Sequence, residues 1–286
     1  MTELREQGVV LLRDIFQRDS LNLLKEAAER CFEQIDRGHS LPDRCRYNRF
    51  SNSLLLTALL DFGCGSREEL LAPLAAPGLE ALFSAAMGEH CTCNLEQSWV
   101  RKKFAPCHAP DGNYHPQGWH QDGALGVRFP AQPGPAIPMT ELLTLWIPLN
   151  PCGIDSPGLE FIRRPQASLL HFTELDDSVL HRRFPPQDFY APELDLGDGL
   201  VFLKSVLHRT HTHPEMRLNR LSIEYRIFAS LPTRKPRKAG LQRIRSNCTP
   251  KPQFSSRRDH KERRPGTKLV RAHQRWIRSN SPLPAA

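Results

Sequence analysis

Long hydrophobic runs are missing from this chain of 286 residues. No segment approaches the roughly 18 consecutive apolar residues that a membrane-spanning helix requires. The opening residues, MTELRE, are charged where a signal peptide has its apolar stretch. We therefore expect a soluble, cytoplasmic protein without a membrane span.

Paired cysteines are missing too. The eight cysteines follow no regular spacing, and Cys91-Thr92-Cys93 lacks the second cysteine pair that would complete a zinc site. A chain of this length can bury a sizeable core without disulfides. The sequence therefore favours free thiols and one large folded domain.

Acidic residues are scarce at the end of the chain. From Arg234 onward, 16 Lys and Arg stand against Asp259 and Glu262, a net charge of +14. Because the whole chain carries +8, residues 1–233 are net acidic, at −6. The final segment is rich in Pro, Arg and Ser without a lasting apolar period, so it cannot bury enough surface to offset its ordering entropy.

We therefore divide the chain into a folded domain at residues 1–232 and a basic, disordered tail at residues 233–286. A basic tail can contact nucleic acid or an anionic membrane surface through phosphate groups. No base-reading motif accompanies this tail, and a solvated appendage without a specific partner is the simpler interpretation.

The first part of the domain has the signals of a strand followed by helices. Gly8–Arg13 is an apolar run typical of a strand, and Asp19 is placed to cap a helix with one apolar stripe. Ser66-Arg67-Glu68-Glu69 has the form of a capping box, followed by a helix that is interrupted near Pro77-Gly78. The rest of the domain consists of short predicted strands bounded by Gly and Pro.

The segment Trp119-His120-Gln121-Asp122-Gly123 contains the first candidate metal ligands. On an extended strand, His120 and Asp122 would point to the same face and present an imidazole beside a carboxylate. A second histidine would complete the two-histidine, one-carboxylate set that holds iron(II) with coordination positions left open. Taken alone, a His-x-Asp sequence is weak evidence, and a polar surface turn is the alternative.

Two downstream strands strengthen the metal hypothesis. Residues 197–208 predict a tight Gly-Asp-Gly turn and a buried strand that ends on His208, and residues 220–228 alternate like a half-buried strand. If these strands pair as a hairpin, Arg220 lies near His208, and Arg220 and Ser222 share a face. A guanidinium fork pairs well with the far carboxylate of a dicarboxylic cosubstrate.

Together these motifs resemble the phytanoyl-CoA dioxygenase family of iron(II)- and 2-oxoglutarate-dependent oxygenases. The resemblance covers most of residues 5–230 and includes the Trp-His-Gln-Asp motif, a Trp-Ile-Pro-Leu strand, a Gly-Leu-Glu-Phe segment and the Gly-Asp strand. The Gly-Ser-His run usual after Gly-Leu-Glu-Phe is replaced by Arg163-Arg164-Pro165. This departure leaves substrate binding at that edge open and does not touch the metal ligands.

The resemblance implies a role for each candidate residue. His120, Asp122 and His208 would hold iron(II), while Arg220 and Ser222 would anchor the far carboxylate of 2-oxoglutarate. The family's distal histidine lies eleven residues after the glycine of the Gly-Asp strand, which selects His208. The neighbouring His211 and His213, and the loop residues His108 and His115, are the competing histidines.

Further cosubstrate contacts are implied on two other predicted strands. A polar residue on the strand that contains Gln97 and Arg101 would contact 2-oxoglutarate, and either residue fits. Thr144 and Trp146 share a face of a strand at residues 141–149. Trp146 would form a wall of the cosubstrate pocket.

These expectations define a fold and a function. Many strands with two helices at the front predict a mainly β protein with flanking helices around a double-stranded β-helix, a jelly-roll, cupin-like core. The implied reaction is hydroxylation of an aliphatic C–H in a small organic or acyl substrate by O2, with succinate and CO2 as coproducts. Desaturation and cyclisation stay open, and a monomer or homodimer is expected.

Two other functions compete with the oxygenase. One is a non-catalytic, metal-binding β-barrel whose basic tail docks on an anionic partner. The other is a zinc hydrolase, which gives Arg220 no role and lacks an evident general base.

Overall fold

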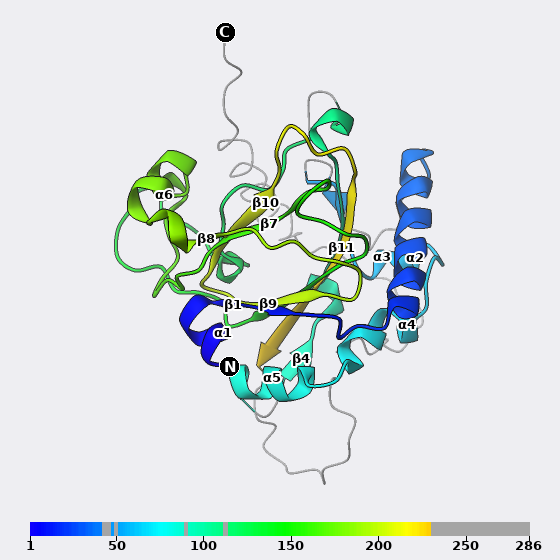
Figure 1. The fold of residues 1–286 in the computed structure, drawn as a ribbon, viewed down its shortest axis with the longest axis horizontal. Helices are drawn as coiled ribbons and strands as arrows, with labels where there is room; N and C mark the ends of the chain where they lie inside the picture. Colours follow the sequence, from blue (N-terminus) through cyan, green and yellow to red (C-terminus); the bar gives the residue numbers. More distant parts are fainter. Residues whose placement is uncertain (42–46, 49–50, 89–90, 111–113, 230–286) are drawn as a thin grey trace, which may run out of the picture.

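The computed structural model describes residues 1–41, 47–48, 51–88, 91–110 and 114–229. They form two mainly antiparallel sheets with helices at the side (Figure 1). The larger sheet has eight strands: β1 (Val9–Leu12), β9 (Gly199–Leu203), β6 (Leu143–Pro148), β11 (Arg220–Ala229), β5 (Trp99–Lys103), β3 (Ser53–Leu55) and β2 (Tyr47–Asn48) in that order, with β4 (Cys91–Cys93) also on β11. The smaller sheet has the order β10 (Leu207–His211), β7 (Gly158–Ile162) and β8 (Phe189–Tyr190).

The two sheets face each other through their side chains. Phe161 of β7 packs edge-on against Phe202 of β9, with ring centroids 5.2 Å apart. A pocket between them is lined by side chains from β5, β6, β9 and β11 on one side and from β7 and β10 on the other. This is the ligand-holding arrangement of a jelly roll.

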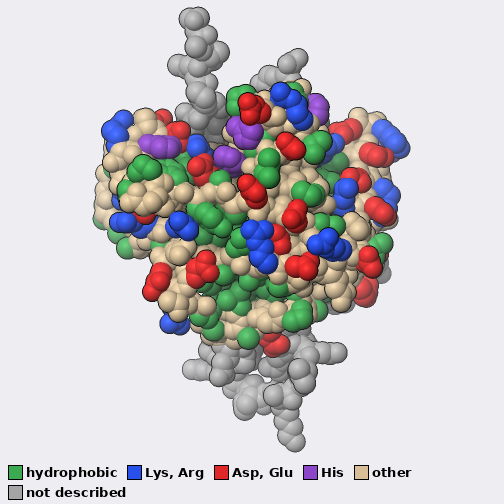
Figure 2. Space-filling model, in the orientation of Figure 1, with side chains coloured by type: hydrophobic (Ala, Val, Ile, Leu, Met, Phe, Trp, Pro, Cys, Tyr) green, Lys and Arg blue, Asp and Glu red, His purple; other side chains and the backbone are tan. Residues whose placement is uncertain are grey.

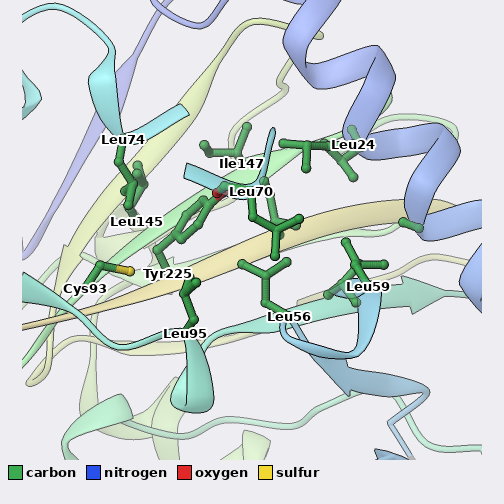
Figure 3. Packing of buried hydrophobic residues seen from close by; sticks show 14 of the residues in the cluster. Leu24, Leu56, Leu59, Leu70, Leu74, Cys93, Leu95, Leu145, Ile147 and Tyr225 are labelled. Carbon is green, nitrogen blue, oxygen red and sulfur yellow. The ribbon is translucent and has the colours of Figure 1, made fainter. Parts of the chain in front are cut away.

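The helices cover the other face of the large sheet. They are α1 (Thr2–Gln7), α2 (Arg18–Asp36), α3 (Ala58–Asp61), α4 (Arg67–Leu71) and α5 (Leu79–Met87), and α6 (Asp177–Arg183) lies apart from them beside the small sheet (Figure 1). Figure 3 shows Leu24 of α2 and Leu70 of α4 near Ile147 and Tyr225 of the sheet. The apolar stripe of α2 thus packs into the core against the sheet.

The local helix signals were partly correct. The capping box at Ser66 is confirmed, since Ser66 Oγ accepts from the Glu69 backbone and Glu69 reaches back to the Ser66 N–H. Asp19 is not the cap: the N-cap of α2 is Gln17, two residues earlier, so Asp19 lies in the first turn of the helix. There a carboxylate still favours the positive end of the helix dipole.

The expected hairpin between the His208 and Arg220 strands is wrong. The strand predicted to run to His208 breaks after Leu203, where Val206 N–H donates to the Leu203 carbonyl, and the chain enters the other sheet as β10. β10 then pairs with β7, whereas β11 pairs with β4, β5 and β6. His208 and Arg220 therefore face each other across the pocket.

Several earlier expectations concern parts of the chain that lie outside the described residues. These are the basic tail and the domain boundary at residues 232–233.

Within the described ranges, no single helix is long and apolar enough to cross a membrane. The bent pair Arg67–Ala75 and Leu79–Met87, which meet at 76°, has the required length and composition only when the two helices are taken together. On the face shown in Figure 2, acidic and basic side chains are interspersed.

Tyr225 offers a test of how the sheet is joined to its helices. Its buried hydroxyl donates to the Leu70 carbonyl of α4 at 2.7 Å, across 155 residues of sequence. Tyr225→Phe removes this bond, so urea unfolding should show a loss of about 1 kcal/mol in the free energy of unfolding. An unchanged midpoint and slope would show that the bond contributes nothing.

Candidate metal centre

His120, Asp122 and His208 form one cluster. Asp122 Oδ1 lies 3.8 Å from His120 Nε2 and 3.7 Å from His208 Nε2, and one donor atom from each residue lies within 4.8 Å of the others. Asp122 and His208 are buried, and the His120 side chain keeps 12% of its surface exposed. Nitrogen and carboxylate donors so close together are suited to a divalent metal ion.

A backbone bridge holds the two histidines together. His120 N–H donates to the His208 carbonyl at 3.0 Å, and His208 N–H donates to the His120 carbonyl at 3.0 Å. The motif is therefore not the continuous strand that was predicted. Asp122 begins a short 3₁₀ turn, η4 (Asp122–Ala124), and Gly123 N–H donates to the Lys204 carbonyl. Gln121 between the two ligands is still extended, at φ −123° and ψ 132°, so alternation across this one residue keeps His120 and Asp122 on the same side, and the bridge places them beside His208.

The second nitrogen of each ring fixes its tautomer. His120 Nδ1 lies 2.8 Å from the Gly118 carbonyl, and His208 Nδ1 lies 3.2 Å from the Val206 carbonyl, so each Nδ1–H donates. Each Nε2 is then unprotonated on the side of the ring nearest Asp122, so its lone pair is available to a metal ion there. In this structure the Gln117 side-chain amide N–H donates to His120 Nε2 at 2.9 Å, and a bound metal would replace this hydrogen bond.

The electrostatics keep the ligands in their metal-binding forms. Burial, together with the neighbouring His208, lowers the pKa of His120 well below its usual value, and burial lowers the pKa of His208. Burial alone would raise the pKa of Asp122, but the Arg226 guanidinium and the two imidazoles hold it below its ordinary range. The site therefore contains neutral imidazoles and a carboxylate at neutral pH.

Arg220 and Ser222 lie on the pocket side of β11 and are completely buried. Arg220 Nη1 donates to the carbonyls of Pro157 and Gly158 at 3.1 and 2.7 Å, and the guanidinium lies 5.0 Å from the Trp146 ring. Within the described residues, Arg220 Nε and Nη2 and Ser222 Oγ have no hydrogen-bond partner. Burial lowers the pKa of Arg220 to about 10, so it stays charged at neutral pH. Buried donors without partners are costly, and a ligand carboxylate would satisfy them.

Three of the four other residues predicted to contact the cosubstrate lie at the pocket or the metal cluster, and Gln97 does not. Trp146 and Arg101 line the pocket, and Thr144 donates to Asp122 Oδ2 at 2.6 Å. Gln97 does not lie on β5, because it ends the 3₁₀ turn η2 (Leu95–Gln97), and it does not line the pocket. Of the two candidates on that segment, Arg101 is the one beside the pocket.

Three charged residues of the site were missed in the sequence. Lys103 pairs in register with Arg220, and burial beside Arg101 and Arg220 lowers its pKa well below the usual value. Glu224 lines the pocket, and Arg226 contacts Asp122. The same period-two alternation that selected Arg101, Arg220 and Ser222 continues onto these residues and could have found them.

The competing histidines lie outside the cluster. His211 ends β10 with Nδ1 3.9 Å from Glu160, His213 contacts the Ile154 carbonyl, and His108 contacts Asn219. His115 is exposed in the preceding loop. The segment at residues 166–196 contains α6 and β8, and Asp177 of α6 accepts from Trp119 Nε1 at 2.9 Å.

The sequence of this chain matches the phytanoyl-CoA dioxygenase family over residues 4–214. The chain belongs to this family. Iron(II) and 2-oxoglutarate are the cofactors of its oxygenases, and the donor set of His120, Asp122 and His208 fits iron. No curated protein matches the chain.

Solved structures of similar fold support the architecture. EctD from S. alaskensis, solved with 2-oxoglutarate and 5-hydroxyectoine, gives a TM-score of 0.58 at 17% identity over 86% of this chain and 85% of that chain. AviO1 from Streptomyces viridochromogenes Tue57 gives 0.54 at 17% identity over 82% and 95%. EvdO2 from Micromonospora carbonacea var. aurantiaca gives 0.52 at 15% identity over 82% and 92%. The predicted jelly-roll, cupin-like fold class is confirmed.

The ligand assignment predicts which substitutions abolish metal binding. His120→Ala, Asp122→Ala and His208→Ala should each weaken Mn(II) or Co(II) binding by more than about 100-fold, since loss of an outer partner alone costs 10–100-fold. Titration of the purified chain measures this. His211→Ala is the matched control on the same strand and should bind normally. Loss of binding in His211→Ala with binding kept in His208→Ala would contradict the assignment.

Proposed function

We propose that this member of the family hydroxylates an aliphatic C–H of a small organic or acyl substrate, using iron(II), 2-oxoglutarate and O2. The observation that carries the proposal is the pairing of two features across one pocket. The His120–Asp122–His208 cluster lies on one side, and Arg220 presents two buried nitrogens without hydrogen-bond partners, Nε and Nη2, on the other. A metal site facing an unpaired guanidinium suits a metal-chelating dicarboxylate.

Each residue has a definite task in this proposal. His120 Nε2, His208 Nε2 and Asp122 Oδ1 hold iron(II), which when bound supplies the oxidising chemistry that converts 2-oxoglutarate and O2 to succinate and CO2 and hydroxylates the substrate. Arg220 and Ser222 bind the far carboxylate, and the Trp146 face beside Arg220 excludes water from that ion pair. The closed, dry setting strengthens the pairing.

The charges around the pocket support an anionic ligand. Arg101 and Arg226 are paired with Glu224 and Asp122, whereas Arg220 has no carboxylate partner among the described ion pairs. A dicarboxylate supplies the missing negative charge. A non-catalytic barrel or a zinc hydrolase would give no reason to bury Arg220 without a carboxylate partner.

The domain boundary belongs to this proposal as well. β11 ends at Ala229, so a catalytic domain at residues 1–232 contains every site residue named above.

Arg220→Ala tests the cosubstrate site. Breaking a buried charge pair costs about 3–5 kcal/mol, so the apparent KM for 2-oxoglutarate should rise by roughly 10²-fold or more while the Kd for iron(II) stays nearly constant. The exposed Arg217→Ala, three residues away, is the matched control. An unaltered cosubstrate requirement in Arg220→Ala would remove the 2-oxoglutarate assignment.

The reaction type is tested by the product. Because Asp122 is present as a ligand, the position that a halide would take is filled, and hydroxylation is expected instead of halogenation. Candidate substrates are first screened for succinate release by the iron-loaded chain. Turnover in chloride-rich buffer under labelled O2 should give a product with one labelled oxygen by mass spectrometry. A chlorinated product, or succinate without substrate oxidation for every candidate, would argue against the proposal.

A further inference from the structure

Both oxygens of the Asp122 carboxylate are engaged from behind the metal centre. Oδ2 accepts from Thr144 Oγ1 at 2.6 Å and from Arg226 Nη1, and Oδ1 accepts from Arg226 Nη2 at 2.8 Å. Oδ1 is also the oxygen that faces His120 and His208. The carboxylate therefore has one oxygen directed toward the histidines and one held by two donors of the large sheet.

Arg226 is itself fixed by a second carboxylate. Its Nη2 contacts Glu224 Oε1, and Glu224 accepts two bonds from Arg101, at 2.9 Å from Nε and 3.0 Å from Nη2. Arg101 Nη1 then donates to Ser53 Oγ at 3.1 Å. Charges alternate along this buried row from the metal ligand to β3, so the position of Arg226 does not depend on Asp122 alone.

The geometry limits what Asp122 can do. A planar guanidinium that bonds to both oxygens of a carboxylate restricts its rotation, and two donors on Oδ2 compete with any second metal bond there. All of the side chains in the row from Asp122 to Ser53 are buried, so water does not compete for these bonds. Groups that hold a metal ligand in this way orient it and set its affinity.

We propose that Arg226 is a positioning residue for the metal centre: held by Glu224 and helped by Thr144, it makes Asp122 present the single oxygen Oδ1 to the metal. The inference rests on the proposed function, because it takes Asp122 as an iron ligand. Binding through one oxygen would take up one coordination position of the metal instead of two. A purely structural Arg226 would instead only neutralise buried charge.

Arg226→Lys separates these two roles, because lysine keeps the charge but lacks the fork. The full-length variant is titrated with Mn(II) and with Co(II), without 2-oxoglutarate, and its Kd is compared with that of the parent chain. We expect a Kd 10–100-fold higher. The visible absorption of the Co(II) form, which reports coordination geometry, should also change as Asp122 gains freedom.

Tyr225→Phe is the matched control. Tyr225 precedes Arg226 on β11 but faces the opposite, apolar core, so this variant should lose stability without any change in metal affinity or Co(II) spectrum. If Arg226→Lys behaves like Tyr225→Phe, with the parent's Kd and spectrum, Arg226 is structural and the inference is wrong.

A second variant covers the case in which Arg226→Lys does not fold. Thr144→Val removes one of the two donors to Asp122 Oδ2 with little change in shape, and a Kd about 10-fold higher is expected. An unchanged Kd and spectrum in Thr144→Val would overturn the inference in that case. If the parent chain itself binds no divalent metal, the proposed function fails first, and the inference fails with it. If the parent chain binds the metal and the variants bind it with the same affinity, the inference about Arg226 is wrong, but the proposed function stands.

Discussion

The backbone bridge between His120 and His208 is the contact on which the whole site depends. Its two hydrogen bonds, each 3.0 Å, join a loop to a strand 88 residues later in the chain. His208 lies on the small sheet. Thr144 and Arg226, the two residues that hold Asp122, lie on the large sheet. The three ligands can therefore meet only where the motif passes between the two sheets.

β11 shows how one strand serves both stability and chemistry. One face places apolar side chains in the core under the helices, namely Leu221, Ile223, Tyr225 and Ile227. The other face places polar and charged side chains on the pocket side, namely Arg220, Ser222, Glu224 and Arg226. Burying an ion costs several kcal/mol unless it is paired. The charges of Glu224 and Arg226 are paired within the protein, whereas Arg220 has no carboxylate partner among the described ion pairs and keeps Nε and Nη2 without hydrogen bonds.

Much of the site could be predicted because it depends on residue type and short spacing. Alternation placed His120 with Asp122 and Arg220 with Ser222, the resemblance to the family selected His208 among the nearby histidines, and the structure brings these residues to one pocket or its wall. Gln97 was misplaced because Asn94 accepts a bond from Glu96 N–H and starts a 3₁₀ turn, which delays the strand to Trp99. Hydrogen bonding by a single side chain decides such a boundary, and a hydrophobic pattern does not record it.

By itself the sequence determined which side chains are present, in what order, and which of them share a face of a strand, since alternation is a local property of an extended backbone. Only the tertiary structure decided that the strand after Gly199 divides between two sheets, that β10 pairs with β7, and that Arg226 reaches back to Asp122 across 104 residues. A strand offers the same donors and acceptors to any neighbour. Its partner is chosen by how all the apolar faces can be buried together, which no short segment specifies.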